Sequence, residues 1–381
     1  MDPQLFQANA PGQVISIGGS EHAFLPHPLP PSWTFPEQLW PLLNEASTKL
    51  GLLEGVGRHL PAADLLLRPL ERREAVQSSA IEGTYATPRE LLLFEIEPSE
   101  ATRASDPANS WKEVFNSQQA LQYGTTSELP LSLRLIRDMH RILLTGVRGQ
   151  ERAPGEFRRV QVAIGASASR RFVPPPVSHL GECLDALEKH LNAEGVYHPL
   201  VDCMLAHYQF EAIHPFMDGN GRVGRMLLAI MIQRRCGLTK PWLYLSDFFA
   251  RHREEYVDRL FAISAQGAWT EWIEFCLQGV ATVAEATVVR CEQLRSLRDD
   301  YMIRVKAAGG SIRLHAIVEG LFRSPVVRVA DLPERLSVTY PTAKSDVERL
   351  IAAGILAELP DTAVRTVYAH EIFRIAYSDL Q

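Results

Sequence analysis

The sequence has few of the features that mark secreted, membrane-spanning or nucleic-acid-binding proteins. Its five cysteines are odd in number, scattered and mostly inside helical patterns, so we expect reduced core residues and no disulfide framework. No apolar run reaches membrane-spanning length, and no basic segment followed by a hydrophobic stretch opens the chain, so we expect a cytoplasmic protein without a membrane partner. The net charge of −6 argues against nonspecific binding of nucleic acid by the whole chain.

What the sequence does contain is a dense polar motif, HPFMDGNGRVGR, which runs from His214 to Arg225. Apolar residues at helical spacing lead into it, and Pro215 disfavours helical backbone at His214, so we expect the imidazole at a helix exit. Gly219-Asn220-Gly221 then begins a second helix, whose first amides have no intrahelical acceptor. Free amides at the positive end of a helix favour an anion, and the glycines allow a phosphate to approach the backbone.

The charged residues of this motif suit a triphosphate. Arg222 and Arg225 are three residues apart and share a helix face, where their guanidinium groups can bind phosphate oxygens in a bidentate manner. Asp218 is the only carboxylate of the loop, which suits Mg²⁺ because that ion takes one or two carboxylates plus phosphates and waters. His214 is the obvious base. A capped helix corner with a surface histidine would explain each residue singly, but not their combination.

The motif resembles that of the Fic family, matching its histidine, phenylalanine, acidic residue, glycine-asparagine-glycine and two arginines. The resemblance implies a compact helical core and transfer of AMP from ATP to a tyrosine, threonine or serine hydroxyl of a target protein, or of the chain itself. It implies His214 as the catalytic base, Asp218 as the Mg²⁺ ligand and Phe216 as the anchor of the loop. The ATP-binding residues that it implies in the motif are His214, Gly219, Asn220, Gly221, Arg222, Val223, Gly224 and Arg225.

A second segment, Ser78-Ser-Ala-Ile-Glu82-Gly83, follows a helical pattern far upstream. Ser78 and Glu82 are one turn apart, and Gly83 fits the left-handed position that ends helices. An acid there opposes the helix dipole, and by itself it is most simply a solvated glutamate. The segment, however, resembles the N-terminal inhibitory helix of some Fic proteins. That resemblance implies that Glu82 pairs with Arg225 in the ATP site, excludes the γ-phosphate and autoinhibits the enzyme.

A third segment has strand periodicity in a largely helical chain. Its residues, predicted to form a target-docking flap, are Val160, Gln161, Val162, Ala163 and Ile164. We expect a hairpin that returns through the proline run 172–176, with an edge that can pair with an extended target peptide. Pro154-Gly-Glu-Phe-Arg158 resembles the start of the flap in the Fic family. The alternative is an ordinary surface hairpin.

The predicted fold is mainly α, with a Fic-type helical core, a small β-hairpin flap, an N-terminal helical region and a C-terminal winged helix. We divide the chain into residues 1–105, with an extended proline-rich arm, a catalytic domain over 106–308 and a winged-helix-like domain over 309–381. Helices are expected near 36–53, 88–96, 109–123, 131–144, 177–191 and 269–306, and short C-terminal strands near 355–357 and 366–368. Candidates for the wall of the nucleotide base pocket, with Arg251 favoured for ATP binding, are Tyr244, Arg251 and Tyr256.

The C-terminal domain carries eight basic and nine acidic residues over 311–381, whereas a DNA reader should be distinctly basic. We therefore favour protein interaction or homodimerisation, and DNA remains a less favoured partner. Two alternatives to autoinhibited adenylylation stay open. One is a DNA-associated regulator that senses a nucleotide, although sensing would need no base. The other is a Fic enzyme that uses another nucleotide donor or removes AMP.

Overall fold

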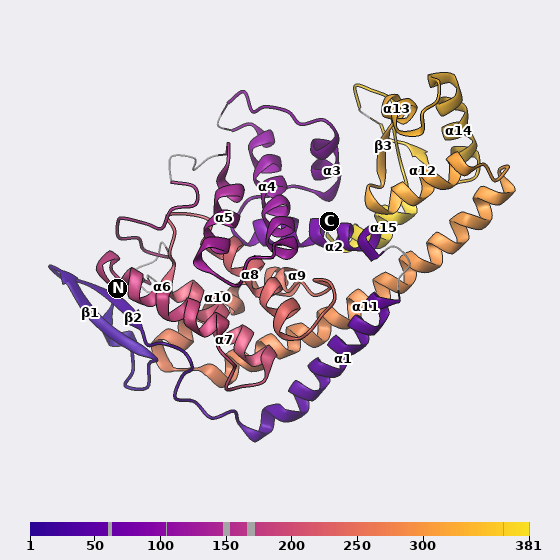
Figure 1. Cartoon of the computed structure of the whole chain (residues 1–381). Helices are drawn as coiled ribbons and strands as arrows, with labels where there is room; N and C mark the ends of the chain where they lie inside the picture. The colour runs from indigo at the N-terminus through magenta and orange to yellow at the C-terminus, as the bar shows by residue number, and fades with distance from the viewer. Residues whose placement is uncertain (60–62, 104, 148–152, 166–171, 361, 381) are drawn as a thin grey trace.

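The computed structural model describes residues 1–59, 63–103, 105–147, 153–165, 172–360 and 362–380. The described chain is mainly α-helical with two small sheets, as the sequence predicted (Figure 1). The five cysteines are all unpaired, and four of them are buried, in agreement with the expectation of reduced core residues.

The centre of the molecule is a pair of helices, α7 (Pro199–Ile213) and α8 (Asn220–Arg235), joined by the polar motif. Almost every residue of α7 is buried, because the helix is apolar on all sides and neighbouring helices cover it. α8 is likewise buried over most of its length. The helices around this pair are α4 (Pro107–Thr126), α5 (Leu133–Leu144), α6 (Val177–Asn192), α9 (Ser246–Arg251) and α10 (Arg253–Gln266).

The N-terminal arm differs from the extended segment that the sequence predicted. After a 3-10 turn, η1 (Pro3–Leu5), it folds into an antiparallel hairpin of β1 (Gly12–Gly18) and β2 (Glu21–Pro26). Phe24 of β2 donates its N–H to the carbonyl of Val173 at 2.8 Å, and its ring lies 5.8 Å from that of Phe172. The hairpin therefore supports the returning arm of the predicted flap.

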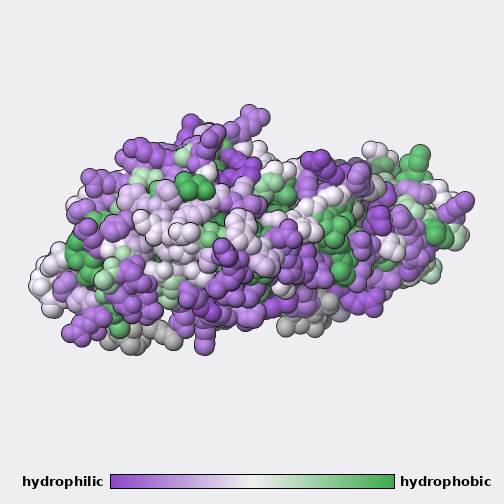
Figure 2. Space-filling view, turned by 90° about the horizontal axis from the view of Figure 1, so that it is seen from below, coloured by the Kyte–Doolittle hydropathy of each residue, from purple (hydrophilic) through white to green (hydrophobic). Residues whose placement is uncertain are grey.

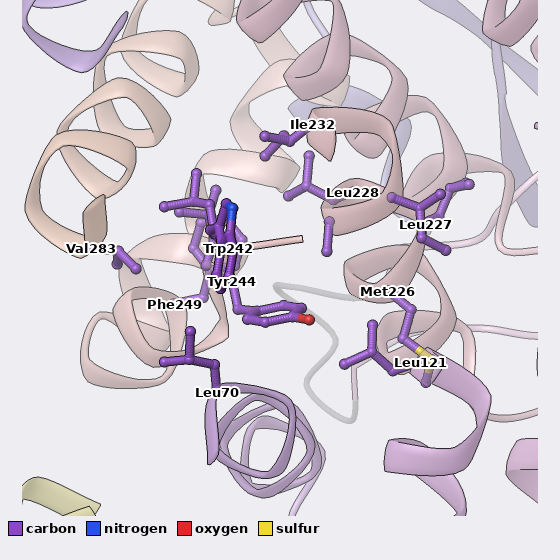
Figure 3. Close-up of a cluster of buried hydrophobic side chains, with 14 of the residues drawn as sticks. Leu70, Leu121, Met226, Leu227, Leu228, Ile232, Trp242, Tyr244, Phe249 and Val283 are labelled. Carbon is purple, nitrogen blue, oxygen red and sulfur yellow. The ribbon is translucent and has the colours of Figure 1, made fainter. Parts of the chain in front are cut away.

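The helix that carries Ser78 is α2 (Ala63–Ile81), followed by α3 (Pro88–Ile96), which begins at a capping box on Thr87. α2 packs on α4, α8, α9 and α12 (Ile312–Arg323). Figure 3 shows Leu70 of α2 pointing into the same buried cluster as Leu227, Leu228 and Trp242. Because α2 shares a core with α8, the end of α2 has a fixed position relative to the arginines of the motif.

The longest helix is α11 (Trp269–Ala307), which runs beside α1 (Trp40–Arg58) and reaches from the core to the C-terminal unit (Figure 1). A short turn, η2 (Glu37–Leu39), precedes α1, so the predicted first helix begins and ends later than expected. By length and composition α11 is also apolar enough to cross a membrane, although 61% of its most apolar stretch is buried within the protein. The expectation that no run reaches spanning length was therefore too strict. This burial is typical of a core helix.

The C-terminal unit follows Gly309-Gly310 and combines short helices with a small sheet. Its three strands are antiparallel in the order β3-β5-β4. The predicted strand at 355–357 is displaced, because Ile355 and Leu356 enter the core and pairing begins at Ala357. The elements are α12 (Ile312–Arg323), β3 (Val326–Arg328), η5 (Val329–Asp331), α13 (Leu332–Leu336), α14 (Tyr340–Ala352), β4 (Ala357–Glu358), β5 (Thr366–Tyr368), α15 (His370–Tyr377) and η6 (Ser378–Leu380).

The final segment returns to the helical core. α15 packs on α2 and α11, and Asp379 pairs with Arg73 of α2 at 2.5 Å. The molecule is elongated, and Figure 2 shows one long face that is largely hydrophilic with separate apolar patches.

Candidate active site

His214 lies where α7 ends, as the sequence predicted. Its backbone adopts a left-handed conformation (φ 48°, ψ 64°), and its N–H donates to the carbonyl of Phe210 at 3.0 Å. The side chain is partly exposed, and its Nδ1 has no hydrogen-bond partner among the described residues. Burial lowers the pKa of His214 to about 4, while Glu82 and the backbone of Glu211 partly oppose this shift. The imidazole is therefore neutral near pH 7 and able to accept a proton.

The loop after His214 is held by its own residues. Asn220 accepts a hydrogen bond from the N–H of Phe216 at 2.8 Å and donates to the carbonyl of the same residue at 2.9 Å. Phe216 is fully buried and stacks on His140, with ring centroids 3.7 Å apart. The anchoring role proposed for Phe216 agrees with this packing. The side chain of Asn220 is committed to the loop and the N–H of Gly219 donates to Asp218, which leaves the backbone amides of Asn220 and Gly221 as the candidates for contact with an anion.

His140 was not singled out from the sequence, yet it links the loop to the start of the flap. Its Nδ1 accepts a hydrogen bond from the N–H of Gly155 at 2.8 Å, so Nε2 carries the proton and donates to the carbonyl of Asp218 at 3.0 Å. Burial lowers the pKa of His140 to about 4, which keeps this neutral tautomer at physiological pH.

The N-terminus of α8 has the uncapped start on which the predicted anion site depends. Gly219, with φ 76°, precedes the helix and offers no side-chain cap to its first amides. A Cβ atom built on Gly221 would lie 2.2 Å from Oε1 of Glu82. Only a glycine at this position leaves room for the carboxylate of Glu82 beside the first turn of α8. A negative group is favoured there by the free amides and the helix dipole.

Arg225 is the residue that holds this carboxylate. Its Nη2 donates to Oε1 of Glu82 at 2.8 Å and to the carbonyl of Ser78 at 2.8 Å, and its Nε donates to the Ser78 hydroxyl at 3.0 Å. Gly83, with φ 81°, ends the helix as predicted. Burial opposes the charge on Glu82, but Arg225 and, to a smaller extent, Arg222 and His214 bring its pKa below the ordinary value. The predicted pairing of Glu82 with Arg225 is therefore present as a charged contact between a buried guanidinium group and a carboxylate side chain that is 38% exposed.

Arg222 is held by a second carboxylate, which the sequence did not reveal. Its Nη1 lies 3.4 Å from Oε2 of Glu113 on α4, and its Nη2 lies 3.8 Å from Oδ1 of Asp218. Thr84, two residues after Glu82, donates its hydroxyl to the same Oε2 of Glu113 at 3.1 Å. Both motif arginines thus pair with carboxylates that reach them from elements upstream of the motif.

Asp218 is a partly exposed carboxylate beside the start of α8. Its side chain is 38% exposed, and its Oδ1 accepts the N–H of Gly219 at 2.7 Å. Within the described ranges no three His, Cys, Asp or Glu side chains cluster as a metal cage. One accessible carboxylate beside an anion site fits Mg²⁺, because phosphate oxygens and waters would complete its octahedron.

Two further acids lie buried under the arginines. Burial raises the pKa of Glu211 to about 8, although Arg225 opposes this shift, and Oε1 of Glu211 has no hydrogen-bond partner among the described residues. Burial also raises the pKa of Glu74 to about 7, against hydrogen bonds from Ser246. Glu211 is therefore largely protonated at pH 7, which leaves Glu82 as the ionised acid beside Arg225.

Some predicted site residues lie elsewhere. Val223 is fully buried in the core, and Gly224 packs against Phe210 while its carbonyl contacts Nδ1 of His207. Both residues face away from the amides of the anion site because they lie on the core side of α8. Their placement supports helix packing in place of the predicted ATP contact.

The base-pocket candidates lie in different surroundings, since Tyr256 is buried beside Arg225 whereas Arg251 pairs with acids away from the motif. Arg251 donates to Asp247 and Asp379, and the residue that reaches the end of α2 is Arg253, whose Nε donates to the carbonyl of Ile81 at 2.8 Å. The interpretation of Arg251 as an ATP ligand therefore has no support in its contacts.

Tyr244 and Tyr256 are buried in the core, where Tyr244 lines a small cavity together with Leu70, Glu74 and Trp242. Figure 3 shows the Tyr244 ring in the cluster of apolar side chains that includes Trp242 and Phe249. The hydroxyl of Tyr256 lies 2.9 Å from Nε2 of His207.

The predicted flap forms only one pair of backbone-to-backbone hydrogen bonds between its two arms among its described residues. Ile164 and Phe172 exchange both backbone hydrogen bonds, at 2.8 and 2.9 Å. The prediction of a strand over 160–164 was wrong for 160–163, because the opposing segment 174–176 is proline, which has no N–H to donate. The predicted turn at 166–171 lies outside the described residues. Val160, Gln161 and Ala163 are exposed on the open edge.

Comparison with known proteins places these elements in a family context. A model described as "Fic/DOC family N-terminal" matches residues 40–126, and one described as "Fic/DOC family" matches residues 130–232. The "Protein adenylyltransferase Fic" of Drosophila grimshawi is 36% identical over 127 residues, which cover 32% of this chain and 25% of that protein. The chain therefore spans about a quarter of the length of the curated relatives it matches.

Solved structures of similar fold have the same family description. A Fic family protein from Desulfovibrio desulfuricans superposes with a TM-score of 0.57 and 20% identity, over 90% of this chain and 98% of that one. Fic-1 from C. elegans gives a TM-score of 0.53 with 22% identity, over 68% and 74% of the two chains. At these identities the structures support the fold alone, and the first of them extends that support across most of the chain.

Proposed function

The chain belongs to the Fic/DOC family, and on this premise we propose that it is a protein adenylyltransferase that Glu82 holds in an inhibited state. In the proposed reaction a target hydroxyl attacks the α-phosphorus of ATP, the new oxygen–phosphorus bond forms and pyrophosphate leaves. The neutral imidazole of His214 takes the hydroxyl proton. Such a transfer depends mainly on positioning and on charge neutralisation around the phosphates.

The observation that carries the proposal is the position of the Glu82 carboxylate. It binds Arg225 at 2.8 Å and lies against Gly221 at the free N-terminus of α8, which is where a phosphate would be most favoured. A carboxylate and a phosphate offer similar oxygens to a guanidinium group. Glu82 therefore occupies an anion site in the manner of a phosphate, so that ATP and Glu82 compete for Arg225.

Mg²⁺ would be held by Asp218, which is accessible and lies beside Arg222. The ion would neutralise phosphate charge during transfer. Arg222 faces the same region, since it pairs with Asp218, and the N–H of Gly219 holds the Asp218 carboxylate in place. The chain's own contribution is thus a cluster of donors around the phosphates, with His214 at the edge of that cluster.

The target would dock at the flap. Residues 160–163 have an open edge next to the single pair formed by Ile164 and Phe172, and an extended peptide can add a strand to such an edge. Main-chain pairing fixes the register of a peptide without requiring a particular sequence. The accepted residue class stays as expected from the family, a tyrosine, threonine or serine of another protein or of this chain.

The C-terminal unit is proposed to bind protein in preference to DNA. Lys344, on the helix that would read DNA, lies 3.9 Å from Glu348, and Arg365 pairs with Glu348 and Glu358. These acids neutralise the cations that would otherwise contact a phosphate backbone.

The decisive experiment determines whether the α-phosphate or the γ-phosphate of ATP is transferred to protein. Wild type, Glu82→Gly and His214→Ala proteins are incubated with a cell extract and with ATP labelled at the α- or γ-phosphate, and then run on denaturing gels. We expect protein-bound label from α-labelled ATP only, strongest for Glu82→Gly and absent for His214→Ala. Retained γ-label would indicate phosphoryl transfer, and equal labelling by all three proteins would contradict both proposed roles. Competition by unlabelled GTP, CTP and UTP tests the choice of donor.

A further inference from the structure

Arg158 is a buried cation that pairs with no carboxylate among the described residues. It is 2% exposed and follows the Pro154-Gly-Glu-Phe segment at the start of the flap. Burial lowers its pKa to about 10, so the guanidinium group stays charged at neutral pH. A buried charge without a counter-ion is costly unless hydrogen bonds satisfy it, and the partners of Arg158 show what its charge does in this fold.

Those partners are backbone carbonyls from three segments. Nε donates to the carbonyl of His214 at 2.9 Å, and Nη2 lies 3.4 Å from that of Ile213. Nη2 also donates to the carbonyl of Pro175 at 2.5 Å, and Nη1 lies 3.4 Å from that of Val160. One planar group therefore touches the end of α7, the outgoing arm of the flap and the returning arm.

The contact between Arg158 and the carbonyl of His214 holds the backbone of the proposed catalytic base in place. The last carbonyls of α7 have no intrahelical donor, and a cation is favoured at the negative end of the helix dipole. The backbone N–H of Arg158 adds a hydrogen bond to the carbonyl of Pro215 at 2.8 Å. The left-handed turn at His214 is thus held on both sides of the residue, which limits how far its imidazole can move.

The other contacts fix the flap. The returning arm is held on its outer side by the Phe24 N–H, which donates to Val173, and on its inner side by Arg158, which donates to Pro175. Gln161 adds a second cross-link, since its Nε2 donates to the carbonyl of Pro174 at 2.9 Å. With the prolines unable to form a ladder, side chains set the distance between the two arms.

We infer that Arg158 is a positioning residue, which holds the backbone of His214 and both arms of the flap with one guanidinium group and so keeps the base in register with a docked target. The inference rests on the proposed function for its kinetic consequences. Its structural consequences, the order of the flap and of the guanidinium group itself, do not depend on that function.

The kinetic test uses Arg158→Lys in the Glu82→Gly background, with the labelled substrate protein found in the gel experiment. Lysine keeps the charge but lacks the planar fork, so it cannot reach all three segments. We expect the KM for the protein substrate to rise about tenfold or more with a fall in kcat, because small displacements at a reacting centre are costly. The KM for ATP should change less than about twofold, because Arg158 contacts none of the anion-site residues.

The matched control is Arg159→Lys, which changes the neighbouring arginine. Its side chain is 84% exposed and pairs with Glu156, so both KM values should stay at those of the parent. Parent-like kinetics for Arg158→Lys, or an equal rise in the KM for ATP and for the protein, would overturn the inference. If the Glu82→Gly parent transfers no AMP, the proposed function fails, and the structural tests still decide the role of Arg158.

The structural tests are hydrogen exchange and NMR. Arg158→Lys should accelerate exchange of the Ile164 and Phe172 amides, which form the single flap pair, whereas Arg159→Lys should leave them protected. In the parent protein, which needs no variant to fold, the Nε–H of Arg158 should exchange slowly and its guanidinium rotation should be hindered. A freely rotating Arg158 guanidinium group, or unchanged amide exchange at Ile164 and Phe172 in a folded Arg158→Lys protein, would contradict the inference that Arg158 holds the flap and His214 in place.

Discussion

The arginines of the anion site and the arginine of the flap are all buried, but their partners differ in kind. Arg225 and Arg222 pair with carboxylates, Glu82 and Glu113, whereas Arg158 donates to backbone carbonyls. A phosphate can replace a carboxylate because both are anions that accept a bidentate guanidinium. A carbonyl within the fold cannot leave its place without local unfolding. The comparison separates an exchangeable site, suited to substrate binding and inhibition, from a fixed clamp, suited to positioning.

His214 belongs neither to the arginines of the anion site nor to the flap contacts of Arg158, and its proposed role is proton transfer. We expect His214→Ala to lower AMP transfer by about 10² to 10⁴-fold, the usual contribution of a general base. Binding of MgATP should persist, because the arginines and the amides of α8 remain. Transfer is measured with α-labelled ATP and binding by calorimetry. His179→Ala, which changes a histidine on α6, is the control. Loss of binding in parallel with transfer would place His214 in the phosphate site instead.

Removing the exchangeable partner should have the next largest effect. Glu82→Gly leaves Arg225 bonded to Ser78 but free of a carboxylate, so the γ-phosphate can reach it. We expect transfer to rise roughly 5- to 150-fold, the usual range of coupling between two sites. Glu97→Gly, at the end of α3, is a matched control because it also removes an exposed acid at a helix end. Equal activation by both variants would remove the special role of Glu82.

The pair of Asp379 and Arg73 lies away from the anion site, so it tests whether any pair of a buried arginine with a carboxylate, or only that of Glu82 and Arg225, affects AMP transfer. Asp379 contacts Arg73, Arg251 and Arg290 from three helices, but no helix N-terminus with free amides faces it in its described contacts. Asp379→Asn should lower the free energy of unfolding by about 1 kcal/mol, since the carboxylate is partly exposed. Transfer should stay at the wild-type level. Urea denaturation and labelling measure the two quantities, with Asp185→Asn as the control.

A rise in protein labelling by Asp379→Asn would contradict the expectation that this pair affects stability alone. Asp379 pairs with Arg73, and Arg73 is five residues before Ser78 on α2. Loss of the pair would then act by changing the position of α2. The C-terminal unit would in that case contribute to inhibition as well as to stability.

The anion site could be predicted from the sequence because its geometry is mostly local. The helix exit at His214, the free helix start after Gly219 and the common face of Arg222 and Arg225 all follow from backbone preferences over a few residues. The contact from Glu82 spans 143 positions, and it was predicted from a family resemblance, since the isolated motif favours a solvated glutamate.

The remaining contacts depend on long-range packing that no local pattern specifies. Glu113 lies inside α4 without any motif, and the carbonyl clamp of Arg158 involves backbone groups that every sequence has. Arg251 was a candidate and Arg253 was not singled out, because the sequence does not show that α9 ends at Arg251 and α10 begins at Arg253. That break at His252 changes which side chain faces the end of α2.

Glu211 provides a contrast to Glu82 beside the same arginine. It is a carboxyl group near Arg225, but in its protonated form it is not an anion that a phosphate could replace. Burial raises its folded-state pKa to about 8 from an ordinary value of 4.5, so the folded protein binds more protons between these values. The free energy of unfolding should therefore fall as pH rises toward 8. The buried histidines, with lowered pKa values, shift stability only below about pH 7, so the clean window is pH 7 to 8.

Within that window we expect wild type to lose on the order of 1 kcal/mol of unfolding free energy, measured by urea denaturation. Glu74, with a pKa of about 7, contributes the smaller part of this loss. Glu211→Gln should flatten the dependence, because an amide has no proton to release, whereas Glu255→Gln on exposed α10 should leave it unchanged. If Glu211→Gln keeps the wild-type slope, Glu211 is already ionised beside Arg225 at pH 7. Arg225 would then have two anionic partners, and displacement of Glu82 alone would not free it for a phosphate.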